Sequence, residues 1–216
     1  DAIPCIPPAW NEMKAQLPLL TDLTDAIVTG LKNGGMDRYA AWQLVDDELA
    51  KAAPEESILR LNVKGLVLTQ WAWDARGGGY APTVAEQGWK NFAIRLEQAQ
   101  KVLEHAYQLF PDDPLAPTQM ITVELGQGKG MDRMELWFDR AMKADPSNIK
   151  ACRAKMYYLE PKWYGSRELQ LAFGRECLAI GKFDTRIPML VLDAHRKIAG
   201  RSPWGSIDIQ PYFAKA

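Results

Sequence analysis

The stretch AQKVLEHAYQLFP, residues 99–111, decides the fold. Ala99, Leu103 and Ala106 stand four and three residues apart, so all three lie on one face of a helix. The two alanines let a second helix approach closely, and the leucine fills the remaining gap. Pro111 then ends the helix, because proline has no backbone N–H to donate. The stretch therefore predicts one member of a closely packed helix pair.

A second copy of this pattern, MELWFDRAMKADP, occupies residues 134–146. Phe138, Ala141 and Pro146 repeat the large, small and proline positions, and Met134 replaces the first small residue. The two prolines stand 35 residues apart, close to the period of about 34 residues in tetratricopeptide (TPR) repeats. A third copy at the same period is degenerate, as terminal repeats often are.

Helical periodicity continues on both sides of these copies, and strand signals are nearly absent. We predict an all-α fold, a right-handed superhelix of TPR-like antiparallel helix pairs (an α-solenoid) with about nine helices. It forms one domain over residues 1–216, with an extended lead-in at 1–20 and an extended C-terminal tail at 201–216. The predicted helices cover residues 21–32, 37–53, 55–76, 83–110, 113–125, 132–144, 147–159, 166–181 and 185–199.

Several predictions concern single helices and their ends. In the first helix, Leu23, Ile27 and Leu31 stand four apart. Thr83 and Glu86 have the spacing of a capping box, in which each side chain bonds a backbone amide of the other. The other predicted N-caps are Asp37, either Ser147 or Asn148, and Ser166, and the predicted glycine stops include Gly77 and Gly126.

Three stretches also resemble a known family. WAWDARGGGYAPTV (71–84), LEPKWYGS (159–166) and LAFGREC (171–177) are similar to a bacterial family of TPR-like proteins of unknown function. The resemblance covers about residues 58–180. It implies the same helical-repeat fold and supplies no activity.

Composition excludes several classes of protein. Lys and Arg number 26 against 27 Asp and Glu, so the net charge of −1 provides no basic field for nucleic acid. The apolar runs are far shorter than the roughly 20 residues of a membrane span, so we expect no membrane insertion. The chain starts at Asp1 without a signal-like segment. This start fits either a processed exported protein or a trimmed chain, and no compartment is indicated.

Three further features favour structural roles. Cys5, Cys152 and Cys177 are widely spaced and odd in number, which predicts free thiols. The glycine-rich segment 126–130 follows a helix and lacks the Ser or Thr of a phosphate-binding loop, so we expect a connecting turn. Glu124 lies in an apolar run and needs a cationic or donor partner if it is buried.

We find no convergent catalytic or metal-binding motif in the sequence. His105 and His195 lie 90 residues apart and are accompanied by no nucleophile or zinc signature. We therefore expect no enzyme and no cofactor.

The best candidate site lies in two loops that combine aromatic and polar residues. One loop surrounds the triple glycine at 77–79, and the other follows residue 160. They end the third and the seventh predicted helices, so in an alternating stack both open at the same edge. Rigid aromatic surface with polar ends is typical of recognition sites, although helix capping and repeat packing explain the same residues. The candidate residues are Trp71, Asp74, Arg76, Tyr80, Lys162, Trp163 and Tyr164.

The leading hypothesis is a protein-interaction or scaffold module that binds a peptide or protein partner on a concave helical surface. The alternative is a small-ligand or regulatory binding protein that uses an aromatic pocket near Trp71 and Trp163.

Overall fold

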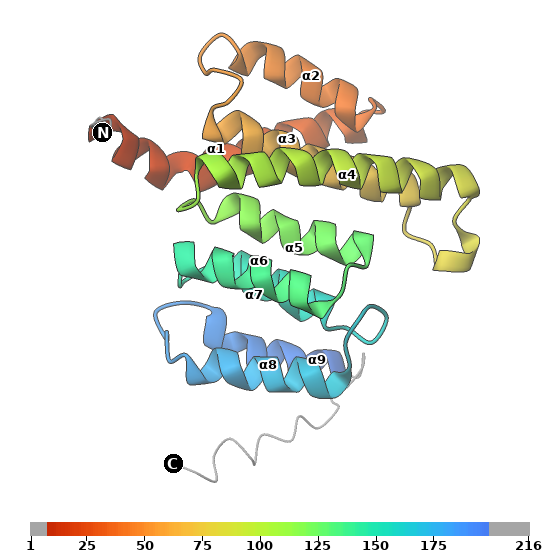
Figure 1. Ribbon diagram of the computed structural model, residues 1–216, viewed down its shortest axis with the longest axis vertical. Helices are drawn as coiled ribbons and strands as arrows, with labels where there is room; N and C mark the ends of the chain where they lie inside the picture. The colour runs from red at the N-terminus through yellow and green to blue at the C-terminus, as the bar shows by residue number, and fades with distance from the viewer. Residues whose placement is uncertain (1–7, 199–216) are drawn as a thin grey trace.

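The computed structural model describes the backbone of residues 8–198 and the side chains of residues 16–198. Every regular element in this part of the chain is a helix, which confirms the all-α prediction (Figure 1). The elements are α1 (Pro8–Asn33), α2 (Arg38–Leu49), α3 (Ile58–Arg76), η1 (Ala81–Thr83), α4 (Glu86–Leu109), α5 (Leu115–Gln127), α6 (Met131–Ala144), α7 (Ile149–Tyr158), α8 (Arg167–Ala179), η2 (Ile187–Met189) and α9 (Leu190–Ile198).

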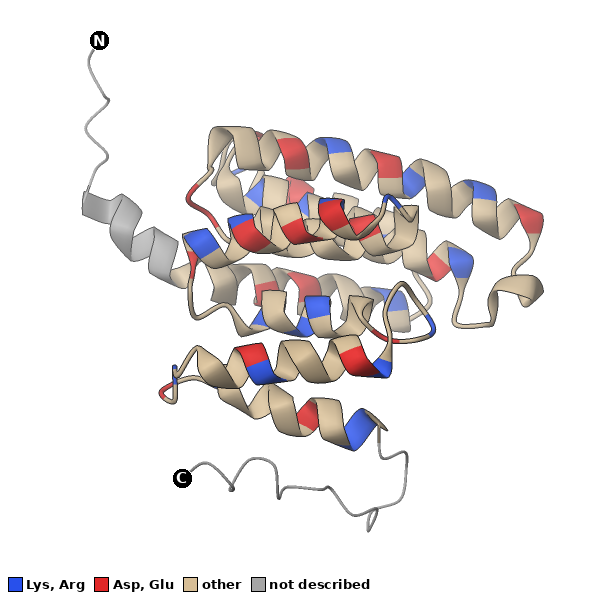
Figure 2. Ribbon diagram, turned by 60° about the horizontal axis from the view of Figure 1, so that its bottom comes forward, with Lys and Arg blue, Asp and Glu red and all other residues tan. Residues whose placement is uncertain are grey.

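The helices form a stack that runs from α2 at one end to α8 and α9 at the other (Figure 1). Each helix packs against its neighbour in the chain, and α3 also packs against α5, and α5 against α7. Charges of both signs are interspersed along the helices (Figure 2). None of the described helices is both long enough and apolar enough to cross a membrane.

The packing of α4 against α3 agrees with the first sequence pattern. Ala99, Leu103 and Ala106 are all buried, with at most 1% of their surface exposed. Leu103 lies against Gly65 of α3, where an added Cβ would come within 2.3 Å of the leucine Cδ2. The absence of a side chain at residue 65 thus brings the two helices together.

The second copy of the pattern is packed differently in one respect. Met134 and Ala141 are fully buried, whereas Phe138 is half-buried and meets Phe173 edge to face at 5.6 Å. Trp137, which the pattern does not include, is the large side chain that α6 buries. The residue just before the patterned Phe138 is therefore the large buried side chain in this copy.

One expectation about the N-terminal part is wrong, and one apolar row lies on an unusual side of its helix. The predicted extended lead-in is helical from Pro8 onward, and residues 1–7 lie outside the described part. The apolar row Leu23, Ile27 and Leu31 lies on the exposed side of α1, although such a row usually marks the buried face of a helix.

The predicted caps are confirmed where one side chain can act alone. Asp37, Asn148 and Ser166 each accept a hydrogen bond from a backbone amide of the following helix. The prediction of a capping box at Thr83 and Glu86 is wrong, because α4 begins at Glu86 and residues 81–83 form the separate turn η1. The Thr83 hydroxyl donates to the carbonyl of Tyr80 instead.

Gly126 does not end its helix as expected. α5 continues to Gln127 and ends at Gly128, whose φ of +65° is the left-handed conformation that glycine adopts freely. The segment as a whole connects α5 to α6, as the sequence predicts. The C-terminal tail, 201–216, lies outside the described residues.

We expect Ala106→Asp to lower the free energy of unfolding by more than about 3 kcal/mol, because it places an unpaired carboxylate in an apolar contact. Gln108→Asp, on the exposed side of the same helix end, is the matched control and costs at most about 1 kcal/mol. Urea denaturation followed by circular dichroism compares the two. Equal stability of the variants would show that the helix register is wrong.

Candidate functional site

Trp71 and Trp73 lie on different faces of α3, because two residues along a helix correspond to a rotation of about 200°. Trp71 is held by α4 and the start of α2. Its Nε1 donates to Asp37 Oδ2 at 2.8 Å, its ring stacks on Tyr39 at 4.9 Å, and the Arg95 guanidinium lies 3.4 Å from its centroid. Burial alone would raise the pKa of Asp37. The hydrogen bonds from Trp71 and two backbone amides outweigh this effect, so the pKa is lowered.

Trp73 faces the loop that follows α7. Its ring meets Trp163 edge to face, with centroids 5.6 Å apart, and meets Phe92 of α4 at 4.8 Å. The loops after α3 and α7 therefore come together, as the helix count predicts.

Arg76 lies among three tryptophans at this junction. Its guanidinium carbon is 5.7 Å from the ring centroids of both Trp73 and Trp163 and 5.3 Å from that of Trp89. The same guanidinium donates to the carbonyls of Gly77 and Gly79, each at 3.1 Å. One cation therefore fastens the triple-glycine turn to the aromatic cluster, which supports the packing account of this residue.

Two glycines at the C-terminal end of α5 let the aromatic side chains approach. An added Cβ at Gly126 would lie 2.5 Å from Leu96, 2.8 Å from Phe92 and 3.4 Å from Trp73. At Gly128 it would lie 2.7 Å from the hydroxyl of Tyr164. The junction therefore forms over a helix end that lacks side chains at these two positions.

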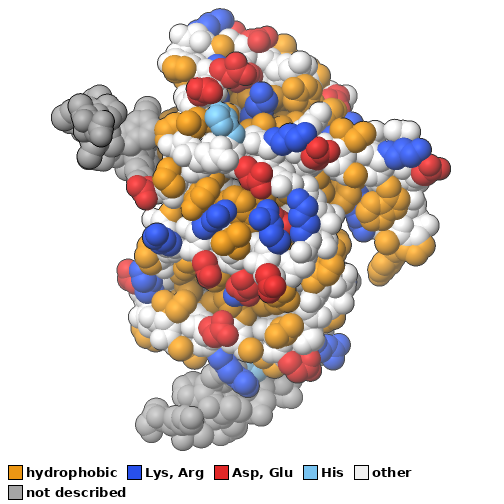
Figure 3. All heavy atoms as spheres, in the orientation of Figure 1, with side chains coloured by type: hydrophobic (Ala, Val, Ile, Leu, Met, Phe, Trp, Pro, Cys, Tyr) orange, Lys and Arg blue, Asp and Glu red, His pale blue; other side chains and the backbone are white. Residues whose placement is uncertain are grey.

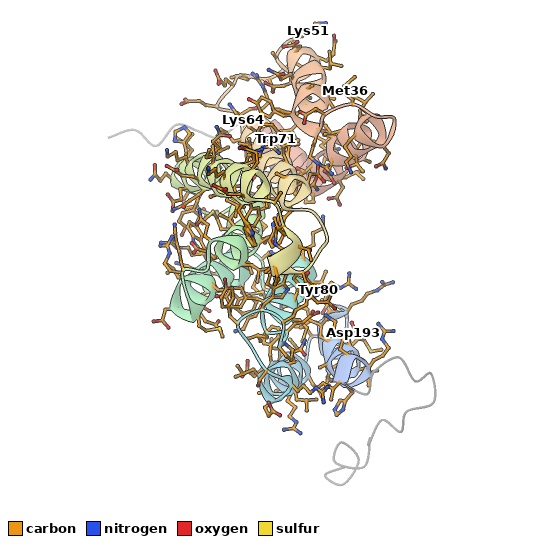
Figure 4. All side chains as sticks on the ribbon, turned by 90° about the vertical axis from the view of Figure 1, so that its right-hand side faces the viewer. Met36, Lys51, Lys64, Trp71, Tyr80 and Asp193 are labelled. Carbon is orange, nitrogen blue, oxygen red and sulfur yellow. The ribbon has the colours of Figure 1, made fainter. Side chains whose placement is uncertain are left out.

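Two further candidates, Tyr80 and Asp74, have other surroundings. Tyr80 is 87% exposed, and it projects from the stack on the loop that also carries hydrophobic side chains in Figure 3. Figure 4 shows Trp71 beside α4 and Tyr80 further down the molecule. Asp74 pairs with Arg38 at 2.7 Å and with Lys32 at 3.7 Å.

Glu160 links Lys162 to α9. It pairs with Lys162 at 2.9 Å and with Lys197. Burial alone would raise the pKa of Glu160, but the hydrogen bonds from Lys197 and Lys162 outweigh it and lower that pKa. Burial would likewise lower the pKa of Lys162, but its hydrogen bonds to Glu160 and Tyr157 raise it.

The structure adds a pocket that sequence reasoning missed. It has a volume of about 320 Å³ and lies between α3 and α5. Two buried polar atoms of its lining residues have no hydrogen-bond partner, the donor Trp73 Nε1 and the acceptor Gln119 Oε1. In the sequence, the signal for this pocket was the presence of polar residues within two otherwise apolar helices. The lining residues are Arg38, Leu66, Thr69, Gln70, Trp73, Asp74, Gln119 and Thr122.

Trp71 and Trp163 make no ring contact with each other in the described structure. Trp71 lines a different pocket of about 380 Å³ together with Tyr39, Lys64 and Gln98. That volume lies within the range of small-molecule sites. Trp163 does not line the pocket that contains Trp71. The alternative hypothesis of one aromatic pocket near both residues would therefore need two separate pockets.

The residues to which the sequence gives structural roles have partners of their own. Glu124 is fully buried and accepts from Arg133 Nη2 at 2.9 Å and Trp137 Nε1 at 3.0 Å, which confirms the expected pairing. His105 lies 3.3 Å from Glu56.

Cys152 and Cys177 are buried free thiols, as predicted, and Cys5 lies outside the described residues. No group of three or more potential metal-binding side chains occurs between residues 16 and 198.

No protein-family model, characterised protein or solved structure matches the chain significantly. The resemblance to a bacterial TPR-like family therefore rests on the quoted stretches alone and stays a hypothesis.

We expect Gly126→Ala to lower the free energy of unfolding by about 1–3 kcal/mol, because the new methyl group overpacks Leu96 and Phe92. Helix propensity alone would instead raise the free energy of unfolding by about 1 kcal/mol, because alanine is a better helix former than glycine. Gly30→Ala in α1 is the matched control. An added Cβ there meets no atom within 4 Å, so stability should stay the same or rise. Thermal melting at low protein concentration measures both, and equal shifts would contradict the close approach.

The lowered pKa of Glu160 predicts a dependence of stability on pH. A lowered folded-state pKa stabilises the fold above the ordinary carboxylate pKa, and this contribution is lost as pH falls through the lowered value. We expect Glu160→Gln to cost less than about 1 kcal/mol at neutral pH, because Lys162 and Lys197 are largely exposed. The cost should vanish in acid. Urea titrations at neutral and acidic pH measure it, and a cost that grows in acid would contradict this assignment.

Proposed function

We propose that this chain is a protein-interaction module that binds an extended segment of a partner protein in the groove between α3 and α5. In this proposal, α3–α4, α5–α6 and α7–α8 are successive TPR-like pairs of a right-handed superhelix. Helices α3, α5 and α7 then line its concave side. The packing of α3 against α5, and of α5 against α7, supports this arrangement.

The observation that carries the proposal is that two residues lining the pocket, Trp73 and Gln119, each keep one polar atom without a hydrogen-bond partner. Trp73 Nε1 is a donor and Gln119 Oε1 is an acceptor, and both atoms are buried. A buried polar group without a partner is costly, so both positions favour a ligand that supplies hydrogen bonds. Each residue of a peptide main chain offers one acceptor and one donor, which matches the two free groups.

The pocket lining favours binding over catalysis. The lining residues include no histidine, cysteine or lysine. The one carboxylate, Asp74, is held by Arg38 and Lys32. The hydroxyl of Thr69 donates to the carbonyl of Gly65, within its own helix. The pocket therefore offers no histidine, cysteine or lysine as a nucleophile or base.

A library of random linear peptides displayed on phage, selected against the immobilised chain, tests the proposal. Affinities of the selected peptides are then measured by isothermal titration calorimetry. We expect Trp73→Phe, which removes the indole N–H and keeps an aromatic ring, to weaken binding by a few-fold to about tenfold, as for one lost hydrogen bond. Gln119→Met should have a similar effect.

Leu136→Ala is the matched control, because Leu136 is 40% exposed on α6 and does not line the pocket. Its affinity should equal that of the unmodified chain. Failure to select any peptide, or peptides that bind both pocket variants normally, would contradict the proposed groove.

A further inference from the structure

Helices α7 and α8 each bury one cysteine in the same core. Cys152 of α7 and Cys177 of α8 are both 0% exposed, and they pack in one cluster with Met156, Phe173 and Leu190. A single buried cysteine usually behaves as a small apolar side chain. Here the chain has three cysteines, and the two that the structure describes share one core although they lie 25 residues apart in the sequence. Ordinary burial does not require two thiols to meet.

The two thiols are in direct contact. The thiol of Cys152 donates to Met142 Sδ at 3.7 Å, and a second hydrogen bond joins Cys177 to Cys152. This second bond lowers the pKa of Cys152, its acceptor, and raises the pKa of Cys177, its donor. The structure holds both residues as free thiols. Two sulfur atoms at hydrogen-bonding distance need only a short approach to reach the bond length of about 2.05 Å in a disulfide.

The contact lies at the joint between the last helix pair and the rest of the stack. Helix α8 packs more extensively against α9 than against α7, and α8 and α9 together end the stack (Figure 1). Gly174 lets α9 approach α8, because an added Cβ there would lie 3.0 Å from Val191 Cα and 3.3 Å from Ala194 Cβ. A covalent bond between α7 and α8 would therefore tie this terminal pair to the stack at its less extensive contact.

We propose that Cys152 and Cys177 form a disulfide bond by exchange with a small-molecule disulfide such as oxidised glutathione. One cysteine thiolate attacks a sulfur of the small disulfide, whose S–S bond breaks, and one glutathione leaves. The other cysteine then attacks the protein sulfur of the mixed disulfide, and the second glutathione leaves. The two cysteine protons pass to the two glutathione sulfurs, and the two electrons lost by the cysteines reduce the glutathione disulfide.

Both thiols are buried, so the small disulfide reaches them while the chain folds or when α8 opens locally. The bond does not involve the pocket between α3 and α5, so this proposal and the proposed peptide groove are independent of each other.

A peptide map of the full chain tests the proposal. The chain is refolded from urea in a mixture of oxidised and reduced glutathione, its remaining thiols are alkylated, and it is digested with trypsin. The three cysteines fall on three different tryptic peptides, which span residues 1–14, 151–153 and 176–182. Mass spectrometry is expected to find the second and third peptides joined in most molecules, with Cys5 on the first peptide left free for alkylation.

The bond should also stabilise the fold. Closing a loop of this length restricts the unfolded chain, so we expect the thermal midpoint to be about 5–10 °C higher without reducing agent than with it. Cys177→Ala should abolish this difference. Cys5→Ala is the matched control and should keep both the joined peptides and the difference in midpoint.

Three results would overturn the proposal. The first is that Cys152 and Cys177 are both recovered alkylated or carrying glutathione. The second is that either of them is joined mainly to Cys5. The third is a joined pair that leaves the midpoint unchanged or lowers it, because the folded joint would then not accommodate the bond. The peptide map of the unmodified chain decides between these results even if Cys177→Ala does not fold.

Discussion

Leu103 of α4 occupies the space that a side chain on residue 65 of α3 would take. This contact sets the distance between the two longest neighbouring helices that are described in full. Helix α3 also joins two parts of the molecule, because its two sides belong to different cores. Leu68 packs with α4 and α5, whereas Val63 and Val67 pack with Val28 of α1 and Trp42 of α2. The position of α3 then determines where its tryptophans meet other elements.

Local signals in the sequence were sufficient for most helix positions and failed where neighbours compete. Asp37 and Ser166 cap their helices because one side chain reaches one backbone amide. Thr83 fails as a cap because it is the last residue of the turn η1, which contains Pro82 and lies just before α4. Gly126 fails as a stop because its lack of a side chain serves the contact with Phe92 rather than the helix end.

The candidate site was predictable in its location and not in its details. Alternating helix direction is enough to bring the loops after α3 and α7 to one edge, and the Trp73–Trp163 contact confirms it. The pocket beside Trp73 depends on the distance and rotation between α3 and α5, which no sequence spacing specifies. Periodicity also identified the apolar row of α1 without showing that this row faces away from the core. Both omissions concern relations between helices, not the helices themselves.

The order of packing along the chain has a consequence for how the protein folds. The extensively packed helix pairs are neighbours or next neighbours in sequence. Most contacts therefore close short loops, a topology that favours rapid folding. The pairing of α3 with α4 is the most extensive of these local contacts. The ion pair between Asp22 and Lys150 joins residues 128 positions apart. It forms only after α1 and α7 have come together, so it reports assembly of the part of the stack between them.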